Sequence, residues 1–305
     1  MIAFTIFGRP VYRYGIFYGI TFLVGYQFLS YVWKQTRLTS YPRVQKLLTV
    51  QLDMFILLII LGVIIWGRLW HVFLYERSYY QDHLWEIVQT RQGGMSFIGG
   101  LLGVVSVLFI LRRKYKLTMT DFLLLWDLVL CVVPLGILLG RIGNFLNKEL
   151  YWRVVYNKAL LSIPVSDSLR DLKDRMLFLD DRYYEAIKKL HLIADYGTAE
   201  KVPGELRLNT NFLQAFGEGF LLLIINHLIL RLRYAKNHIR PGFISGVFLV
   251  GYGIVRFLAE YLKALPDYEI RGPLSVSQWV MIGFICAGIL LVRRTKKQHE
   301  LPASY

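Results

Sequence analysis

The chain has 305 residues, of which 55% are hydrophobic, and its formal net charge is +15. A soluble domain is rarely so apolar and so basic together, and the apolar residues are gathered into long runs, so the composition indicates a polytopic helical membrane protein. The basic residues lie in short clusters between these runs, which argues against nucleic acid as a partner. The two cysteines, Cys131 and Cys286, both lie in apolar runs, which excludes a disulfide framework and a CxxC metal pattern. We expect neither a metal nor an organic cofactor.

Seven apolar segments are predicted to cross the membrane, at residues 14–33, 52–73, 97–111, 122–139, 212–230, 243–262 and 276–292. The first is long enough to stay in the membrane, so we expect no removable signal peptide. The third is short and needs the preceding residues 93–96 to reach full depth, or it is tilted or broken. The predicted fold class is therefore an all-α integral membrane protein with seven transmembrane helices, a single polytopic domain over residues 1–305.

Loop charge predicts the orientation of these helices. Sixteen Lys and Arg residues lie in the loop 34–46 and directly after the third, fifth and seventh segments, against six in the segments on the other side. The positive-inside rule places the N-terminus outside and the C-terminus in the cytoplasm. Residues 150–208 then form a small extracytoplasmic head between spans four and five. Helical periodicity over residues 168–192 predicts that this head consists of amphipathic helices.

Several charged and amide side chains lie within or at the ends of the predicted spans, where such groups are functional-site hypotheses. Arg141 and Asn144 follow the fourth segment and share a helix face at a spacing of three. Tyr252, Arg256 and Glu260 line one face of the sixth segment at spacings of four. Two alternatives stay open: Arg141 is a snorkelling residue at a helix end, or Arg256 and Glu260 form a purely structural ion pair.

The second segment carries a further pair, Arg68 and His71, and the fourth carries Asp127, either as a partner for an arginine or as a helix-packing residue. Arginine presents planar, bidentate donors that suit phosphate. Three arginines near the outer ends of their spans, Arg68, Arg141 and Arg256, therefore indicate a site for an anionic phospholipid head group in the outer leaflet.

Separated motifs in this sequence resemble those of the bacterial phosphatidylglycerol–prolipoprotein diacylglyceryl transferases. The strongest is Gly140-Arg-Ile-Gly-Asn-Phe-Leu-Asn-Lys-Glu-Leu150, which resembles the family signature. The others, in chain order and covering most of the chain, are Arg13-Tyr14-Gly15, Gly67-Arg68 with His71, Gly93-Gly94-Met95-Ser96-Phe97, Gly99-Gly100-Leu101, residues 246–266, and Ser275 with Gln278.

The resemblance implies transfer of the diacylglyceryl group of phosphatidylglycerol to the lipobox cysteine thiol of preprolipoproteins, in a monomer of the bacterial inner membrane surrounded by lipid. It implies that Arg141 and Arg256 hold and neutralise the phosphate and that Tyr252 orients it. It also implies a set of substrate-binding residues: Tyr14, Arg68, Gly99, Asn144, Asn147, Glu149, Glu260 and Gln278. Glu260 would fix Arg256, and Arg68 would support the site.

The chain departs from the family pattern at three places. Ile98 stands where the family usually has histidine, and Trp152 stands where it has glycine. In the family's Arg-x-Pro-x-Gln-x-Tyr-Glu stretch, residues 207–214 here, the proline, glutamine, tyrosine and glutamate are all replaced. Ile98 cannot move a proton, so His71 is the candidate base, with a structural role as the alternative. Two other functions stay open: a paralogue that keeps the lipid site but has another acceptor or no catalysis, and a transporter, for which the expected inverted repeats are not seen.

Overall fold

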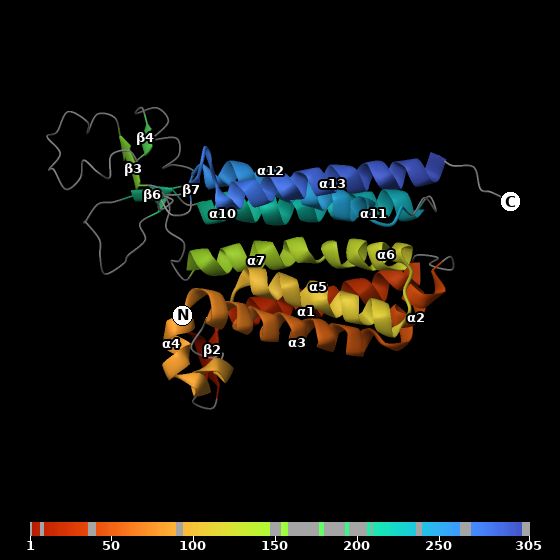
Figure 1. Ribbon diagram of the computed structural model, residues 1–305, viewed down its shortest axis with the longest axis horizontal. Helices are drawn as coiled ribbons and strands as arrows, with labels where there is room; N and C mark the ends of the chain where they lie inside the picture. The colour runs from red at the N-terminus through yellow and green to blue at the C-terminus, as the bar shows by residue number, and fades with distance from the viewer. Residues whose placement is uncertain are drawn as a thin grey trace, which may run out of the picture. The chain divides into compact units, whose positions relative to one another are not determined.

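A computed structural model of the chain describes residues 2–6, 9–35, 41–89, 94–146, 154–157, 177–179, 193–194, 206–208, 210–235, 240–262 and 270–300 (Figure 1). The chain divides into two compact units. Unit 1 contains residues 1–21, 130–230 and 243–305, and unit 2 contains residues 22–129 and 231–242. Each unit is described by itself below.

The described part of the chain is mainly helical. Its helices are α1 (Arg13–Gln35), α2 (Pro42–Val50), α3 (Leu52–Trp70), η2 (His71–Tyr75), α4 (Arg77–Asp82), η3 (Leu84–Val88), α5 (Phe97–Lys114), α6 (Met119–Leu130), α7 (Val133–Leu146), α10 (Thr210–Gln214), η6 (Ala215–Leu221), α11 (Leu222–Ala235), α12 (Phe243–Glu260) and α13 (Val276–Glu300).

Six stretches among the described residues are long and apolar enough to cross a membrane: Tyr14–Val32, Leu52–Leu74, Met119–Leu146, Asn211–Leu232, Phe243–Glu260 and Val276–Thr295. They confirm a multi-pass helical membrane protein and correspond to six of the seven predicted segments. The remaining predicted segment is the 18-residue helix α5, whose last turn holds three basic residues. The third stretch, Met119–Leu146, extends seven residues beyond the end of the predicted segment 122–139, so Arg141 and Asn144 lie within helix α7.

The helices of unit 1 include α7, α10, η6, α12 and α13. Helices α12 and α13 lie side by side (Figure 1). A Cβ atom at Gly246 would lie 2.9 Å from the carbonyl oxygen of Gly288, and small residues of this kind let two helix backbones approach closely. Helix α7 packs on both α10 and η6, and α12 also contacts both. Three stretches distant in sequence therefore meet in this unit.

Unit 2 is organised by the packing of α3 on α5 and by the amphipathic helix α2. Helix α2 begins at Pro42, whose ring fixes a helical φ and whose missing N–H is not needed in a first turn. Val44, Leu47 and Leu48 lie on one face at helical spacing and are buried, which fixes α2 against the unit. Asp127 accepts a hydrogen bond from the backbone N–H of Gly242 at 2.8 Å, so it packs a helix junction.

Two helical segments have π-type hydrogen bonding. They are η2, which continues α3, and η6, which joins α10 to α11. A π-helical turn accommodates one extra residue and is frequent at functional sites. Both turns here contain a polar residue inside a membrane stretch, His71 in η2 and Glu218 in η6.

Short strands lie outside the membrane stretches. Strands β1 (Ile2–Ile6) and β2 (Arg9–Tyr12) pair antiparallel, as do β7 (Ile270–Arg271) and β8 (Leu274–Ser275). Residues 154–208 include a four-stranded sheet in the order β4-β3-β6-β5, formed by β3 (Val154–Asn157), β4 (Leu177–Leu179), β5 (Ile193–Ala194) and β6 (Leu206–Leu208) (Figure 1). The helical prediction for residues 168–192 is therefore wrong at Leu177–Leu179, because these residues pair in parallel with residues 155–157. The remainder of residues 168–192 lies outside the described residues.

Candidate functional site

Four charged side chains from three helical segments of unit 1 form one cluster. Arg141 of α7 lies 3.4 Å from Glu218 of η6, measured from Nη2 to Oε2. Arg256 of α12 lies 3.6 Å from the other oxygen of Glu218 and 3.9 Å from Glu260, one turn further along α12. Glu218 therefore bridges the two arginines. We call these four residues the arginine–glutamate cluster.

The four side chains of the cluster are almost completely buried within the unit. The side chains of Glu218 and Glu260 are 0% and 1% exposed, and those of both arginines are 16% exposed. Charges in such a place are stable only when they are paired, because desolvation otherwise costs several kcal/mol per ion. Two positive and two negative charges meet this requirement, and the carboxylates hold the arginines in place.

The pairing leaves hydrogen-bonding capacity unused. The separations of 3.4–3.9 Å are long for charge-assisted hydrogen bonds. The buried Nη1 of Arg256 forms its ion pair with Oε1 of Glu218 at 3.6 Å, a separation longer than that of a hydrogen bond. Both amide atoms of Gln214, which is completely buried in α10, have no hydrogen-bond partner within the described ranges. Buried polar groups normally have partners, so the Gln214 amide, with one acceptor and one donor group, and the loosely paired Arg256 indicate a place for a polar ligand.

Asn144 lies one turn after Arg141 on α7 and accepts a hydrogen bond from the hydroxyl of Tyr14 on α1. Gly143 makes this contact sterically feasible, because a Cβ atom there would lie 2.8 Å from Cε1 of the Tyr14 ring. The prediction that Arg141 and Asn144 share a helix is confirmed. The Gly140-Arg-Ile-Gly-Asn motif thus presents an arginine and an amide, with a tyrosine from another helix against it.

Tyr252 lies on α12 one turn before Arg256. Its ring stacks on Phe248, with ring centres 5.7 Å apart and an interplanar angle of 14°. It also interacts electrostatically with Glu218 and with both arginines of the cluster. The structure therefore brings together the predicted residues Tyr14, Arg141, Asn144, Tyr252, Arg256 and Glu260.

Arg68 belongs to unit 2, and backbone carbonyl groups accept its hydrogen bonds. Its Nε donates to Ile87 at 2.8 Å, Nη1 to Gly94 at 3.1 Å and Nη2 to Glu86 at 2.6 Å. The guanidinium also lies over the ring of Tyr80, 5.1 Å from its centre. The buried Arg68 therefore holds the segment around η3 against the end of α3.

His71 and Gly99 also belong to unit 2. Nε2 of His71 lies 3.3 Å from Oε2 of Glu76, and the His71 ring meets the Tyr80 ring edge-on. Gly99 lies where α3 packs on α5, because a Cβ atom there would lie 2.9 Å from Cα of Gly67. Ile98 is in the first turn of the same helix α5.

Gln278 caps helix α13. Its side-chain oxygen accepts a hydrogen bond from the backbone N–H of Ser275 at 2.9 Å, and its own N–H donates to Oγ of Ser275 at 3.1 Å. This reciprocal pair is a capping box at the start of the helix. Its side-chain amide also donates to the carbonyl of Phe257 in α12 at 3.4 Å. Asn147 and Glu149, the last two predicted site residues, lie outside the described residues.

Glu218 is the member of the cluster that the sequence patterns alone did not place in the site. The available signal was a single carboxylate within the apolar segment 212–230. A charged residue within a membrane has a high free-energy cost and normally has a charged partner. The sequence could therefore have indicated that Glu218 has a partner, but not that it has two.

The chain was compared with known proteins. Residues 1–294 match the family model described as prolipoprotein diacylglyceryl transferase. The chain is 36% identical over 258 residues to the phosphatidylglycerol–prolipoprotein diacylglyceryl transferase of Neisseria meningitidis serogroup C, with 81% of this chain and 82% of that protein covered. It is 29% identical over 280 residues to the Burkholderia cenocepacia enzyme of the same name (90% and 88% covered), and 32% identical over 281 residues to the Cupriavidus necator enzyme (90% and 86% covered). The chain therefore belongs to the prolipoprotein diacylglyceryl transferase family.

Proposed function

We propose that this chain transfers the diacylglyceryl group of phosphatidylglycerol to the lipobox cysteine thiol of preprolipoproteins, the first step of lipoprotein maturation. The names of its relatives and the family match support this activity. The observation that carries it in the structure is the pair Arg141 and Arg256, joined through Glu218 at separations of 3.4 and 3.6 Å.

The reaction requires a positive site for a phosphate. The cysteine sulfur forms a bond to the terminal glycerol carbon of the diacylglyceryl group, and the bond from that carbon to the phosphate oxygen breaks. The electron pair leaves with the oxygen, so glycerol phosphate is released with one more negative charge than the phosphodiester carried. Donors fixed in advance at a water-poor site stabilise this developing charge. Arg141 and Arg256 would supply them, with Glu218 and Glu260 holding both side chains ready.

Neighbouring residues would place the lipid. Asn144, held by Tyr14, would position the phosphate beside Arg141, and Tyr252 would do so beside Arg256. Arg68 would support the site by fixing the η3 segment. Gly99 would position the backbone of α5 against α3 through helix packing. Gln278 would position the backbone at the start of α13. We retain Asn147 and Glu149 as substrate-binding residues from the family motif.

The thiol must lose its proton to attack, because the thiolate is the nucleophile. We propose His71 as the acceptor, since Ile98 replaces the usual histidine and cannot take a proton. The carboxylate of Glu76 beside His71 would stabilise the protonated imidazole. The arginines would contribute a positive field that favours the thiolate.

We further propose seven spans, with α5 added to the six long apolar stretches, and an N-terminus outside. The protein would be a monomer of the bacterial inner membrane, with surrounding lipids and preprolipoprotein signal peptides as its partners. The basic clusters at alternate loop positions support this orientation. Cysteine labelling of whole cells at Trp85, beyond the second span, and at Lys116, beyond the third, tests it: reagent outside the cell should reach only the first position.

Complementation tests the function. The gene would replace the host transferase in a conditionally depleted bacterium, beside Arg141→Ala and the matched surface change Arg113→Ala. We expect growth and mature lipoprotein with the unchanged protein and with Arg113→Ala, and neither with Arg141→Ala. Well-expressed protein that gives no rescue would contradict the proposal and favour a paralogue with another acceptor. Ile98→His then separates the remaining cases, because added histidine raises activity only if the acceptor is still a lipobox thiol.

A further inference from the structure

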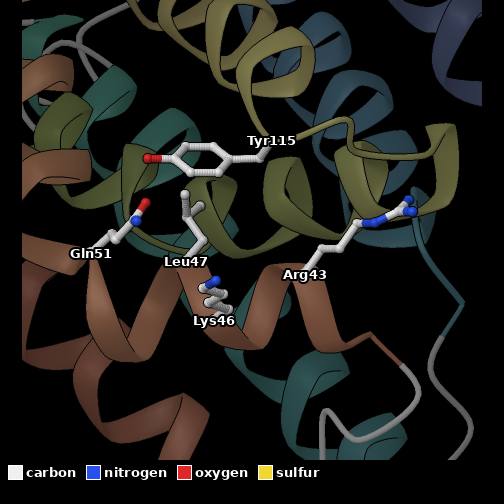
Figure 2. Close-up of a pocket in the computed structure, with 5 residues that line it drawn as sticks. All are labelled: Arg43, Lys46, Leu47, Gln51 and Tyr115. Atoms are coloured by element: carbon white, nitrogen blue, oxygen red, sulfur yellow. The ribbon is translucent and has the colours of Figure 1, made fainter.

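We propose that unit 2 contains a second anion-binding site, which binds a phospholipid head group carrying both phosphate and hydroxyl groups. The site is a cavity of about 210 Å³ lined by Arg43, Lys46, Leu47, Gln51 and Tyr115 (Figure 2). None of these residues belongs to the arginine–glutamate cluster, and the inference does not depend on the reaction proposed above. By the loop charges, this end of unit 2 faces the cytoplasm.

The cavity is built from two segments. Helix α2 contributes Arg43, Lys46 and Leu47, and Gln51 occupies the turn between α2 and α3. Tyr115 comes from the residue directly after α5 and forms the opposite wall, with its hydroxyl on the side of Gln51 (Figure 2). The buried side chain of Leu47 forms the apolar floor of the cavity. A single buried water needs about 10–15 Å³ of such cavity volume, so the space accommodates a group far larger than one water.

Positive charge surrounds this space. Arg43 and Lys46 are three positions apart and therefore lie on the same side of α2. The Lys114 ammonium lies 5.6 Å from the centre of the Tyr115 ring. Within the described ranges, the acid that pairs with these residues is Asp121, whose Oδ2 lies 3.8 Å from Nη1 of Arg43. That oxygen already accepts hydrogen bonds from Thr118 at 2.8 and 3.0 Å, so Arg43 retains donors for a phosphate.

Gln51 indicates which kind of anion fits. Its side-chain oxygen is buried and accepts no hydrogen bond from any residue within the described ranges. A phosphate at neutral pH presents mainly acceptors and cannot satisfy this oxygen, whereas a hydroxyl group donates to it. An ammonium head group would also donate, but it would meet Arg43 and Lys46. A head group with a phosphate and a glycerol-type hydroxyl satisfies both ends of the cavity.

An apolar surface next to the cavity favours a lipid over a soluble phosphate. Val50 at the end of α2 is exposed, and so are Met54 and Leu57, which lie three positions apart on one side of α3. Acyl chains can lie along these residues while the head group is held by Arg43 and Lys46. A soluble phosphate ester would leave this surface unused.

Photo-crosslinking of the full chain tests the site. A photoreactive phenylalanine would replace Tyr115, and a second sample would carry it at Tyr31, an exposed position of α1. Both proteins would be placed in bilayers of phosphatidylcholine with phosphatidylglycerol, and crosslinked lipids identified by mass spectrometry. We expect phosphatidylglycerol to be enriched at position 115 relative to position 31 by about fivefold for each basic side chain that holds it.

Variants identify the contacts. The double change Arg43→Gln with Lys46→Gln should abolish the enrichment, and the matched double change Arg113→Gln with Arg231→Gln, which removes two exposed charges elsewhere in unit 2, should preserve it. In bilayers that also contain phosphatidylserine, Gln51→Leu should reduce the preference for phosphatidylglycerol over phosphatidylserine. Equal lipid composition at positions 115 and 31 would overturn the proposal. So would loss of the lipid crosslink in excess inorganic phosphate, because the site would then take the free anion.

Discussion

Tyr14 donates a hydrogen bond to Asn144, and the contact joins α1 to α7 across 130 positions of sequence. Tyr14→Phe removes the donor and keeps the ring, so Asn144 beside Arg141 loses its orientation. Because a neutral hydrogen bond contributes about 1 kcal/mol, we expect transferase activity to fall about fivefold. Activity in membranes with a lipobox peptide measures this. Tyr31→Phe, at an exposed position of the same helix, is the control. Equal activities of the two variants would show that the contact is dispensable.

The two glycines beside Arg141 should differ sharply in their response to a methyl group. In Gly143→Ala the new Cβ would press on the ring of Tyr14 at 2.8 Å and on Phe17 at 3.2 Å. Overpacking of this kind costs about 1–3 kcal/mol, so we expect a lower melting temperature and a larger loss of activity than in Tyr14→Phe. At Gly140 a Cβ would meet no described atom within 4 Å, and Gly140→Ala should keep or raise the melting temperature. Thermal unfolding of the purified proteins makes the comparison.

Glu218→Gln keeps the shape of the side chain but removes the charge shared by both arginines. Loss of one partner from a buried ion pair costs about 3–5 kcal/mol, so the variant should unfold at a clearly lower temperature. Phosphatidylglycerol should restore more stability to the variant than to the unchanged protein, because its phosphate then provides the missing negative charge.

Glu76→Gln is the matched control for Glu218→Gln. It removes a carboxylate whose side chain is half exposed and lies beside His71, and exposed ion pairs contribute little to stability. A Glu218→Gln protein with the melting temperature and lipid response of this control would contradict the bridging role.

Arg68→Lys keeps the charge at the end of α3 but loses the planar fork that reaches three carbonyl groups. We expect faster amide hydrogen exchange in residues 84–89, since fewer hydrogen bonds hold this segment. The same experiment on Arg112→Lys, whose guanidinium lies over the Phe122 ring, provides the comparison. Unchanged exchange would show that the segment is held without Arg68.

The membrane helices and the spacing of their polar residues could be predicted from the sequence, because both depend on local pattern. Apolar runs identified six membrane stretches, and the spacing of Arg256 and Glu260 anticipated an ion pair that the structure contains. Local pattern was insufficient where distant backbone groups decide the structure. Residues 177–179 have a helical pattern but form a strand with residues 155–157.

The same limit applies to the site. As a membrane-level arginine, Arg68 resembles a phosphate-binding residue. Its side chain instead donates hydrogen bonds to carbonyl groups 18–26 positions away, and a side-chain pattern does not reveal such backbone contacts. Asp127, which the sequence left between an arginine partner and a packing residue, accepts a hydrogen bond from a backbone N–H 115 positions away. Glu218 was visible as an isolated acid, but its two partners come from helices that only the folded chain brings together.

The π-helical turn η6 constrains how this protein can change. Residues within and after the turn face different neighbours: Glu218, in the turn, meets the arginines, whereas Asn226, eight positions later, donates to the carbonyl of Leu130 at 2.7 Å. Removal of one residue from η6 would restore regular α-helical winding and rotate one group relative to the other by about 100°. Both contacts could not then persist. Insertions and deletions across residues 215–221 should therefore abolish activity, because they would separate Glu218 from the arginines or Asn226 from Leu130.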